Sequence, residues 1–227
     1  MPNLEYQIAR YDYIRDPDEI YRRSVEIVCG EAKLSAFPKL MQALAIRLIH
    51  SCGMIDIVDD LDYSPNAAEQ GIEALRDGAS IFCDVEMVRA GIIESSLPAA
   101  NQVICTLNDP QVSNCVDIIG KTRSASAVDL WREKLSRSLV VVGNAPTALF
   151  RLLELIEKGA SMPALIIGVP VGFVGAVQSK QLLSRFSSDL PFITVHGRRG
   201  GSAMASALVN ALALSQEREI INDVSLA

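Results

Sequence analysis

Residues 139–147 read LVVVGNAPT, a run of four apolar residues that leads into a turn containing glycine, asparagine and proline. Four further short apolar runs occur along the chain, and most of them lead through Gly, Pro, Asn or Asp into a helical pattern. Strands that alternate with helices are typical of a parallel sheet, and continuous apolar strands indicate that both of its faces are covered. The sequence therefore predicts a three-layer α/β/α fold around a five-stranded, mainly parallel sheet. The other four runs are SIFC (80–83), VICT (103–106), ALII (164–167) and FITV (192–195).

The residues before the first of these runs predict a helical extension. Asp16 and Pro17 suit the N-cap and first position of a helix that runs to about Ala32. Pro38 begins a second helix, and the following stretch MIDIVDDL (54–61) alternates apolar and acidic residues like an edge strand. No low-complexity or Ser/Gly-rich linker divides the chain, so residues 1–227 are predicted to form a single domain with an N-terminal helical extension.

The composition argues against several classes of partner. Only 5% of the residues are aromatic and the net charge is −6, which disfavours nucleic acid and anionic membranes as partners. The first 20 residues are charged and lack the apolar core of a signal peptide. The chain has five cysteines and no CxxC pair, which favours free thiols in a reducing cytoplasm over a zinc site or disulfides. The cysteines are Cys29, Cys52, Cys83, Cys105 and Cys115.

Polar and glycine-rich segments follow the predicted strands, at the sheet edge where ligands bind in this architecture. The last of them, HGRRGGS (196–202), opens a helix predicted at 202–214. Its backbone N–H groups and its two arginines, Arg198 and Arg199, form a candidate anion site, and the alternative is a tight turn with exposed arginines. The other segments at this edge are Asp84, Asn108-Asp109, GNAPT (143–147) with Asn144 and Thr147, and GVPVG (168–172).

His50, one of two histidines in the chain, is the candidate acid. It falls in the last turn of the helix that begins at Pro38, because Gly53 fits the left-handed position just past a helix end. The helix dipole favours the imidazolium form there, which suits a proton donor near neutral pH. The alternative is a histidine that only caps its own helix.

Other motifs of known chemistry are absent or weak. The sequence has no GxSxG, GxxxxGK[ST] or HExxH motif, so hydrolase, NTPase and metallopeptidase functions lack support. GVPVGFVG (168–175) has the glycine density of a dinucleotide loop but lacks the GxGxxG spacing, so NAD binding is a weak hypothesis. Asp56, Asp59 and Asp60 form either a metal site or a solvated face, and the absence of a calcium-loop pattern favours the solvated face.

Six segments together resemble the precorrin-8X methylmutase family, which includes the cobalt-precorrin-8 methylmutases. They follow the order of the family and, with the helix at YRRSVEIV (21–28), cover the chain from about Tyr13 to Leu214. One departure is Gln178, where the family commonly has glutamate. The six segments are RLIHSCGMIDIVDDL (47–61), IFCDVEMVRAGI (81–92), KTRSASAVDLW (121–131), VVVGNAPTALFRLLELI (140–156), PALIIGVPVGFVGAV (163–177) and GRRGGSAMASALVNALAL (197–214).

This resemblance implies an isomerase of cobalamin biosynthesis with a flavodoxin-like fold. The expected reaction moves a methyl group from carbon 11 to carbon 12 of precorrin-8X or cobalt-precorrin-8 and gives hydrogenobyrinate or cobyrinate. The resemblance also implies a homodimer with the site near the subunit interface. The catalytic histidine of the family matches His50, and residues at its substrate site match Ser24 and Arg123.

The residues themselves agree with this chemistry. A methyl shift needs no metal or other cofactor, and protonation of the macrocycle by His50 would assist it. The carboxylate arms of the macrocycle would bind to Arg123, Arg198, Lys180 and the polar groups at helix starts, namely Ser124, Asn144 and Thr147. For Arg123 the alternative is an ion pair with Asp129 or Glu133. Two other functions remain open, a corrinoid carrier without turnover and a nicotinamide-dependent oxidoreductase.

Overall fold

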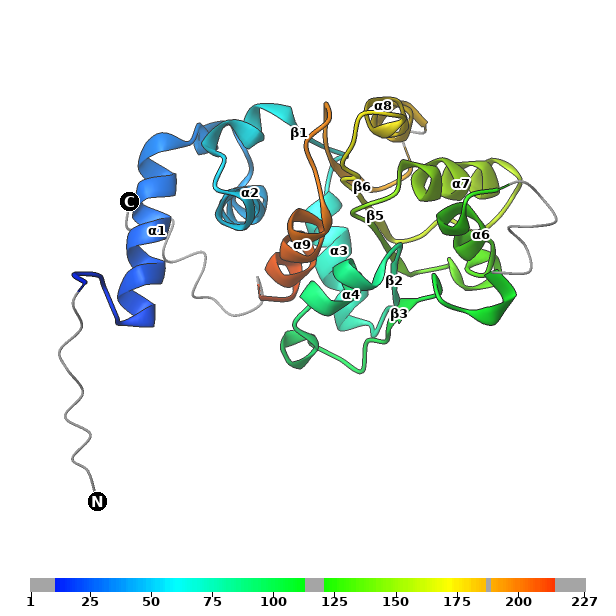
Figure 1. Ribbon diagram of the computed structural model, residues 1–227, viewed down its shortest axis with the longest axis horizontal. Coiled ribbons are helices and arrows are strands. Elements are labelled where there is room, and N and C mark those ends of the chain that lie inside the picture. Colours follow the sequence, from blue (N-terminus) through cyan, green and yellow to red (C-terminus); the bar gives the residue numbers. More distant parts are fainter. Residues whose placement is uncertain (1–10, 113–120, 187–188, 215–227) are drawn as a thin grey trace, which may run out of the picture.

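The computed structural model describes residues 11–112, 121–186 and 189–214, and Figure 1 shows a mixed α/β fold. Six strands form one sheet in the order β1-β6-β5-β4-β2-β3. Strands β2 to β6 are mutually parallel, and β1 is antiparallel to β6. The strands are β1 (Leu61–Tyr63), β2 (Ile81–Cys83), β3 (Val103–Cys105), β4 (Leu139–Val142), β5 (Leu165–Gly168) and β6 (Phe192–Val195).

The five parallel strands lie where the apolar runs predict them, but the predicted number of strands is wrong by one. The sixth strand, β1, begins at Leu61, and the residues before it form a 3-10 helix, η2 (Ile55–Asp60). The alternation in this stretch buries Ile57 and Val58 in a helical turn, while Asp56 and Asp60 both reach Arg199 far along the chain. The edge strand predicted at 54–61 is therefore displaced toward the carboxyl terminus.

Helices cover both faces of the sheet (Figure 1). In β4, Leu139 and Val141 join the apolar cluster of one face, while Val140 and Val142 join the cluster of the other. Continuous apolar strands are the expected result of this double coverage. On the first face lie α3 (Ala67–Arg76), α4 (Glu86–Gly91) and α9 (Ser202–Leu214), and on the second lie α6 (Arg123–Asp129), α7 (Pro146–Glu157) and α8 (Ala176–Phe186).

The N-terminal extension consists of α1 (Pro17–Glu31), η1 (Leu34–Ala36) and α2 (Lys39–Cys52). Helix α2 packs on α9, and α1 packs on α2 at one end of the molecule (Figure 1). The predicted bounds are confirmed: Pro38 is the N-cap of α2, and Gly53 ends it at a φ of 68°. Two short 3-10 helices, η3 (Glu94–Ser96) and η4 (Arg132–Lys134), complete the described structure, in which no helix is long and apolar enough to span a bilayer.

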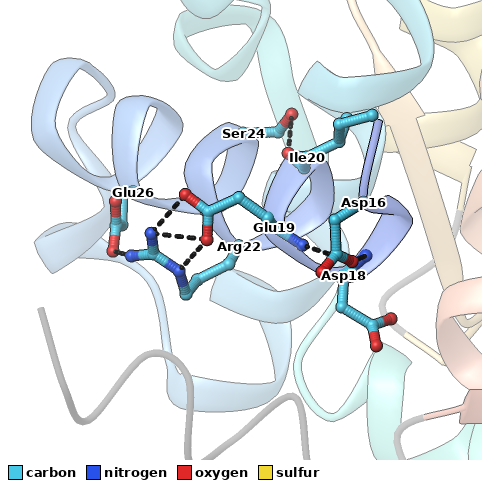
Figure 2. A network of polar contacts seen from close by, with 7 residues as sticks. All are labelled: Asp16, Asp18, Glu19, Ile20, Arg22, Ser24 and Glu26. Carbon is cyan, nitrogen blue, oxygen red and sulfur yellow. Dashed lines mark hydrogen bonds and ion pairs between the residues drawn. The ribbon is translucent and has the colours of Figure 1, made fainter. Parts of the chain in front are cut away.

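Side chains on α1 stabilise it locally, as Figure 2 shows. The carboxylate of Asp16 accepts hydrogen bonds from the backbone N–H groups of Asp18 and Glu19, which satisfies donors that a helix start leaves free. One turn on, the guanidinium of Arg22 pairs with Glu19 at 2.7 Å and also with Glu26. Such exposed pairs at helical spacing stabilise a helix only weakly. They hold the helix that carries Ser24.

Candidate active site

The loops after β5 and β6 are fastened to each other at the carboxyl edge of the sheet. The N–H of Gly201 donates to the carbonyl oxygen of Val169 at 2.9 Å, and the N–H of Gly172 donates to the carbonyl oxygen of Arg198 at 3.2 Å. Gly200 has a φ of +157°, and a Cβ atom there would lie 2.2 Å from the oxygen of Val169. The turn at Gly200 therefore requires glycine. The two loops form one unit, which we call the paired loops (168–175 and 196–201).

The two adjacent arginines of the paired loops have different roles. Arg199 is held by two carboxylates, Asp56 at 2.7 Å and Asp60 at 2.6 Å. Arg198 is exposed, and its guanidinium lies 5.3 Å from the centre of the Phe173 ring. Of this pair, Arg198 is therefore the one that can receive an anionic ligand. The acids of η2 are paired with cations, and the described residues hold no cluster suited to a metal ion.

Lys180 lies beneath the paired loops and is fully buried. Its ammonium donates to the carbonyl oxygen of Arg199 at 2.7 Å. Burial lowers the pKa of Lys180 to about 8, although the negative charge of Asp60 opposes this shift. The predicted contact between Lys180 and a substrate carboxylate is at odds with this position, because the side chain has no exposed surface. Nearby on α8, Gln178 is exposed.

Asp84 anchors the turn between β4 and α7. Its carboxylate is 1% exposed and accepts hydrogen bonds from the N–H groups of Gly143, Asn144 and Ala145 at 3.0, 2.9 and 2.7 Å. Burial raises the pKa of Asp84, and these three hydrogen bonds oppose the rise. The backbone donors of this turn are thus already occupied, so a ligand there meets side chains instead, with Asn144 exposed and Thr147 half-buried.

Arg123 begins α6 beside the end of β3. Its Nε donates to the carbonyl oxygen of Leu107 at 2.9 Å, and one Nη donates to Oδ1 of Asn108 at 2.6 Å. Its neighbour Thr122 caps the helix and is bonded to Thr147 across 2.8 Å, while Ser124 is half-buried. The ion pair with Asp129 or Glu133 is not formed: no described carboxylate pairs with Arg123, and Asp129 binds Lys121 and Arg151. The guanidinium is held in place with its charge uncompensated by these residues.

His50 lies in the last turn of α2, as predicted, with an exposed side chain. The ring of Tyr21 on α1 lies 6.2 Å from the imidazole, centre to centre. The guanidinium of Arg47, one turn before His50, lies 4.9 Å from the same tyrosine ring, and its buried Nε has no hydrogen-bond partner in the described structure. Ser24 follows Tyr21 by one turn and is half-buried, with its hydroxyl bonded to the carbonyl oxygen of Ile20 at 2.8 Å.

The predicted site residues thus fall into three groups, one of which is Arg198 and Lys180 at the paired loops. Ser24 and His50 belong to the extension, while Arg123, Ser124, Asn144 and Thr147 lie around the starts of α6 and α7. In Figure 1, α1 and the α6–α7 pair lie toward opposite ends of the long axis of the molecule. The paired loops lie nearer the extension, because Arg199 binds η2 and its charge acts on Cys52 at the end of α2.

A cavity of about 320 Å³ lies away from all of these groups. It is lined by α3 and by residues that precede β4, β5 and β6, so it opens at the amino edge of the sheet. None of the predicted site residues lines it.

Comparison with known proteins decides the family. A model of the precorrin-8X methylmutase family matches residues 19–215. The chain belongs to this family. A precorrin-8X methylmutase of Pseudomonas aeruginosa is 55% identical over 206 residues, which cover 91% of this chain and 99% of that protein. A precorrin-8X methylmutase of a Sinorhizobium species is 50% identical over 91% of this chain and 98% of its own length.

The structural comparison agrees. The crystal structure of the precorrin-8X methylmutase of Thermus thermophilus superposes with a TM-score of 0.78 at 33% identity, covering 90% of this chain and 97% of that one. The chain is therefore a methylmutase, an isomerase of cobalamin biosynthesis, as the resemblance predicts. A carrier without turnover and a nicotinamide oxidoreductase are not favoured.

Three structural features of the site were not predicted from the sequence. The anchoring role of Asp84 depends on three N–H groups some 60 residues further along the chain. The selection of Arg198 over Arg199 depends on carboxylates about 140 residues earlier. The exposure of Phe173, at 82%, contradicts the usual burial of phenylalanine. A signal existed only for Phe173, which together with Val174 stands between two glycines in an apolar segment.

Proposed function

We propose that the protein transfers the methyl group of precorrin-8X from carbon 11 to carbon 12 and releases hydrogenobyrinate. The observation that carries this proposal is the position of His50: an exposed imidazole at the carboxyl end of α2, in a chain of the methylmutase family.

His50 acts in this proposal as a general acid. Protonation of the macrocycle withdraws electron density from the carbon that carries the migrating methyl group, so the bond to carbon 11 breaks as the bond to carbon 12 forms. The proton returns to the histidine or to water when the product is complete. Tyr21 packs beside the imidazole and limits the positions that the ring can take.

Basic and polar side chains bind the carboxylate arms of the macrocycle. Arg123 and Arg198 supply the charge, because neither pairs with a carboxylate among the described residues. Charge-assisted hydrogen bonds of this kind are stronger than hydrogen bonds between neutral groups. Ser24, Ser124, Asn144 and Thr147 supply neutral contacts. Lys180 does not touch the substrate in this proposal, and instead supports the loop through its hydrogen bond to the Arg199 carbonyl oxygen.

We propose that the working form is a homodimer in which both subunits contribute to each site. The support is the separation of α1, which carries Ser24, from α6, which begins at Arg123, along the long axis of the molecule (Figure 1). A flat macrocycle with arms on all sides can bridge such groups when they come from two chains. In addition, Ile20 and Ile27 flank Ser24 on α1 and are 45% and 51% exposed, which suits a surface that a second copy covers.

The substrate in this proposal carries no cobalt. Two relatives named precorrin-8X methylmutase are 55% and 50% identical to this chain. The relatives named cobalt-precorrin-8 methylmutase, from Salmonella typhimurium and five other organisms, are 31% to 38% identical. Specificity for the metal-free substrate is therefore the better supported choice.

We further propose that residues 1–227 act as one cytoplasmic, flavodoxin-like domain. Counted along the chain, the parallel strands β2 to β6 have the order 2-1-3-4-5, which is common to doubly wound sheets. Cys83 and Cys105 are direct neighbours on β2 and β3 and remain free thiols, which suits a reducing compartment.

The proposed reaction is tested by incubation of the purified protein with precorrin-8X. The visible spectrum should change to that of hydrogenobyrinate, and the same incubation with cobalt-precorrin-8 should be much slower. Binding of hydrogenobyrinate without any conversion of precorrin-8X would contradict the reaction and favour a carrier. Equal rates with both substrates would contradict only the metal-free specificity.

A further inference from the structure

The tip of the loop between β5 and α8 exposes two large apolar side chains. Phe173 is 82% exposed and Val174 is 90% exposed. They follow β5 at the carboxyl edge of the sheet, where ligands bind in parallel α/β folds. Isolated apolar side chains on a surface need no explanation, but two adjacent ones on a glycine-bounded tip form a small platform. We call Phe173 and Val174 the apolar tip.

The backbone beneath the apolar tip is rigidly supported. The N–H of Gly172 is bonded to the carbonyl oxygen of Arg198, and the approach of Gly200 to Val169 leaves no room for a side chain. Lys180 and the two aspartates of η2 hold Arg199 at its carbonyl and its guanidinium. These contacts prevent the loop from folding back and burying its apolar side chains, which indicates that the fold maintains their exposure.

A cation accompanies the apolar tip. The guanidinium of Arg198 lies 5.3 Å from the centre of the Phe173 ring and is itself exposed. The combination offers an apolar surface and, at its margin, one positive charge on a protein with a net charge of −6. A flat apolar ring that carries carboxylate arms matches both features at once.

A second copy of the chain fits these features less well. Two side chains of this size present about 300 Å² at most, whereas a stable dimer buries about 800 Å² on each partner. The area is adequate for one face of a macrocycle. We propose that Phe173 and Val174 form a stacking subsite for one face of the corrinoid, with Arg198 binding a carboxylate arm at its margin. This assignment rests on the proposed function and adds to it the residues that contact the ring.

Replacement of phenylalanine by tryptophan gives a direct readout. The only native tryptophan, Trp131, is fully buried and bonded to Thr106, so it provides a constant background. In Phe173→Trp the added indole should emit as a solvent-exposed residue, and hydrogenobyrinate should quench it by close contact. The emission of Trp131 in the unmodified protein should change much less.

Binding of hydrogenobyrinate to truncated variants supplies the second test. Phe173→Ala should bind roughly tenfold more weakly, and Phe173→Ala with Val174→Ala more weakly still. The matched control is Met162→Ala, an exposed apolar residue before β5 at the opposite edge, which should bind normally. Each variant should have the same oligomeric state as the parent protein, measured as its mass in solution at the concentration used for binding.

The outcomes separate this inference from the proposed function. Normal binding by Phe173→Ala, together with catalysis by the parent protein, would overturn the stacking subsite and leave the methylmutase reaction intact. Loss of dimer in Phe173→Ala would also overturn the subsite, because a second copy would then cover the tip. If the parent protein neither binds nor converts the corrinoid, both the proposed function and the subsite fail.

Discussion

The ammonium of Lys180 donates to the carbonyl oxygen of Arg199 from a fully buried position. Burial lowers the folded-state pKa of this lysine from 10.5 to about 8. Between these two values the unfolded chain binds a proton that the folded chain does not, so the free energy of unfolding should rise with pH across that window. Other groups titrate there too, and a variant is therefore needed to isolate the contribution.

Lys180→Met should remove this contribution. Relative to the parent protein, the variant should be more stable at pH 7. Removal of the buried charge should stabilise it by up to roughly 3 kcal/mol, and loss of the hydrogen bond should cost about 1 kcal/mol. The advantage should shrink as the pH approaches 10.5. Urea unfolding at several pH values measures the difference, with exposed Lys134→Met as control. A stability difference that does not vary with pH would show that burial does not lower the pKa of Lys180. Because Arg199 loses its support, corrinoid affinity should fall even where stability rises.

His50→Asn should lower turnover by roughly a hundredfold or more, since an amide keeps hydrogen bonding but cannot deliver a proton. Hydrogenobyrinate should still bind, because the carboxylate contacts remain. If His50 only caps α2, its loss should cost about 1 kcal/mol of stability and leave turnover per folded molecule nearly unchanged. Turnover, product affinity and unfolding measured on the same preparation distinguish the two roles, and near-normal turnover by His50→Asn would exclude proton donation.

Arg123→Ala should weaken the binding of hydrogenobyrinate by about 1.5–3 kcal/mol, the value of a charged hydrogen bond. The folded structure should be retained, because the contacts of Arg123 with Leu107 and Asn108 lie at an exposed helix start. Titration calorimetry measures the change. Arg132→Ala, which removes an exposed arginine from η4, is the control and should bind normally. An unchanged dissociation constant for Arg123→Ala would leave this residue a structural role only.

Gly200→Ala should disrupt the paired loops. The new Cβ would lie 2.2 Å from the oxygen of Val169, and backbone cannot yield as a flexible side chain does. We expect a loss of roughly 3 kcal/mol or more in stability together with a loss of corrinoid binding. Gly30→Ala is the matched control, because its Cβ meets no atom within 4 Å and alanine favours the helix there. Equal stability of the two variants would contradict the close approach of the loops.

The parts of the fold that were predicted correctly depend on local patterns. The runs that become β2 to β6 are apolar without interruption, and this is sufficient because both faces of each strand are buried. The bounds of α1 and α2 follow from Asp16, Pro38 and Gly53, whose conformational preferences act within one turn. In the stretch 54–61 the alternation of apolar and acidic residues does not identify a strand, because Asp56 and Asp60 are held by Arg199, a partner far along the chain.

The site was harder to predict because its chemistry depends on burial and on distant partners. Nothing in the sequence around Lys180 shows that its ammonium lies under the carbonyl oxygen of Arg199. Adjacent Arg198 and Arg199 are equivalent in the sequence, and only the folded chain distinguishes them. The position of His50 at a helix end was available from the sequence because it needs only Gly53.

The antiparallel pairing of β1 with β6 also means that the sheet can be completed only late in the synthesis of the chain. Leu61 pairs with Val195, so a ribosome must add more than 130 further residues before β1 has its partner. At 5–20 residues per second this wait lasts on the order of ten seconds. Helix α2 likewise packs on α9, which is among the last described elements. The nascent N-terminal third must therefore leave the ribosome with its apolar face uncovered, a period in which chaperone binding would protect it.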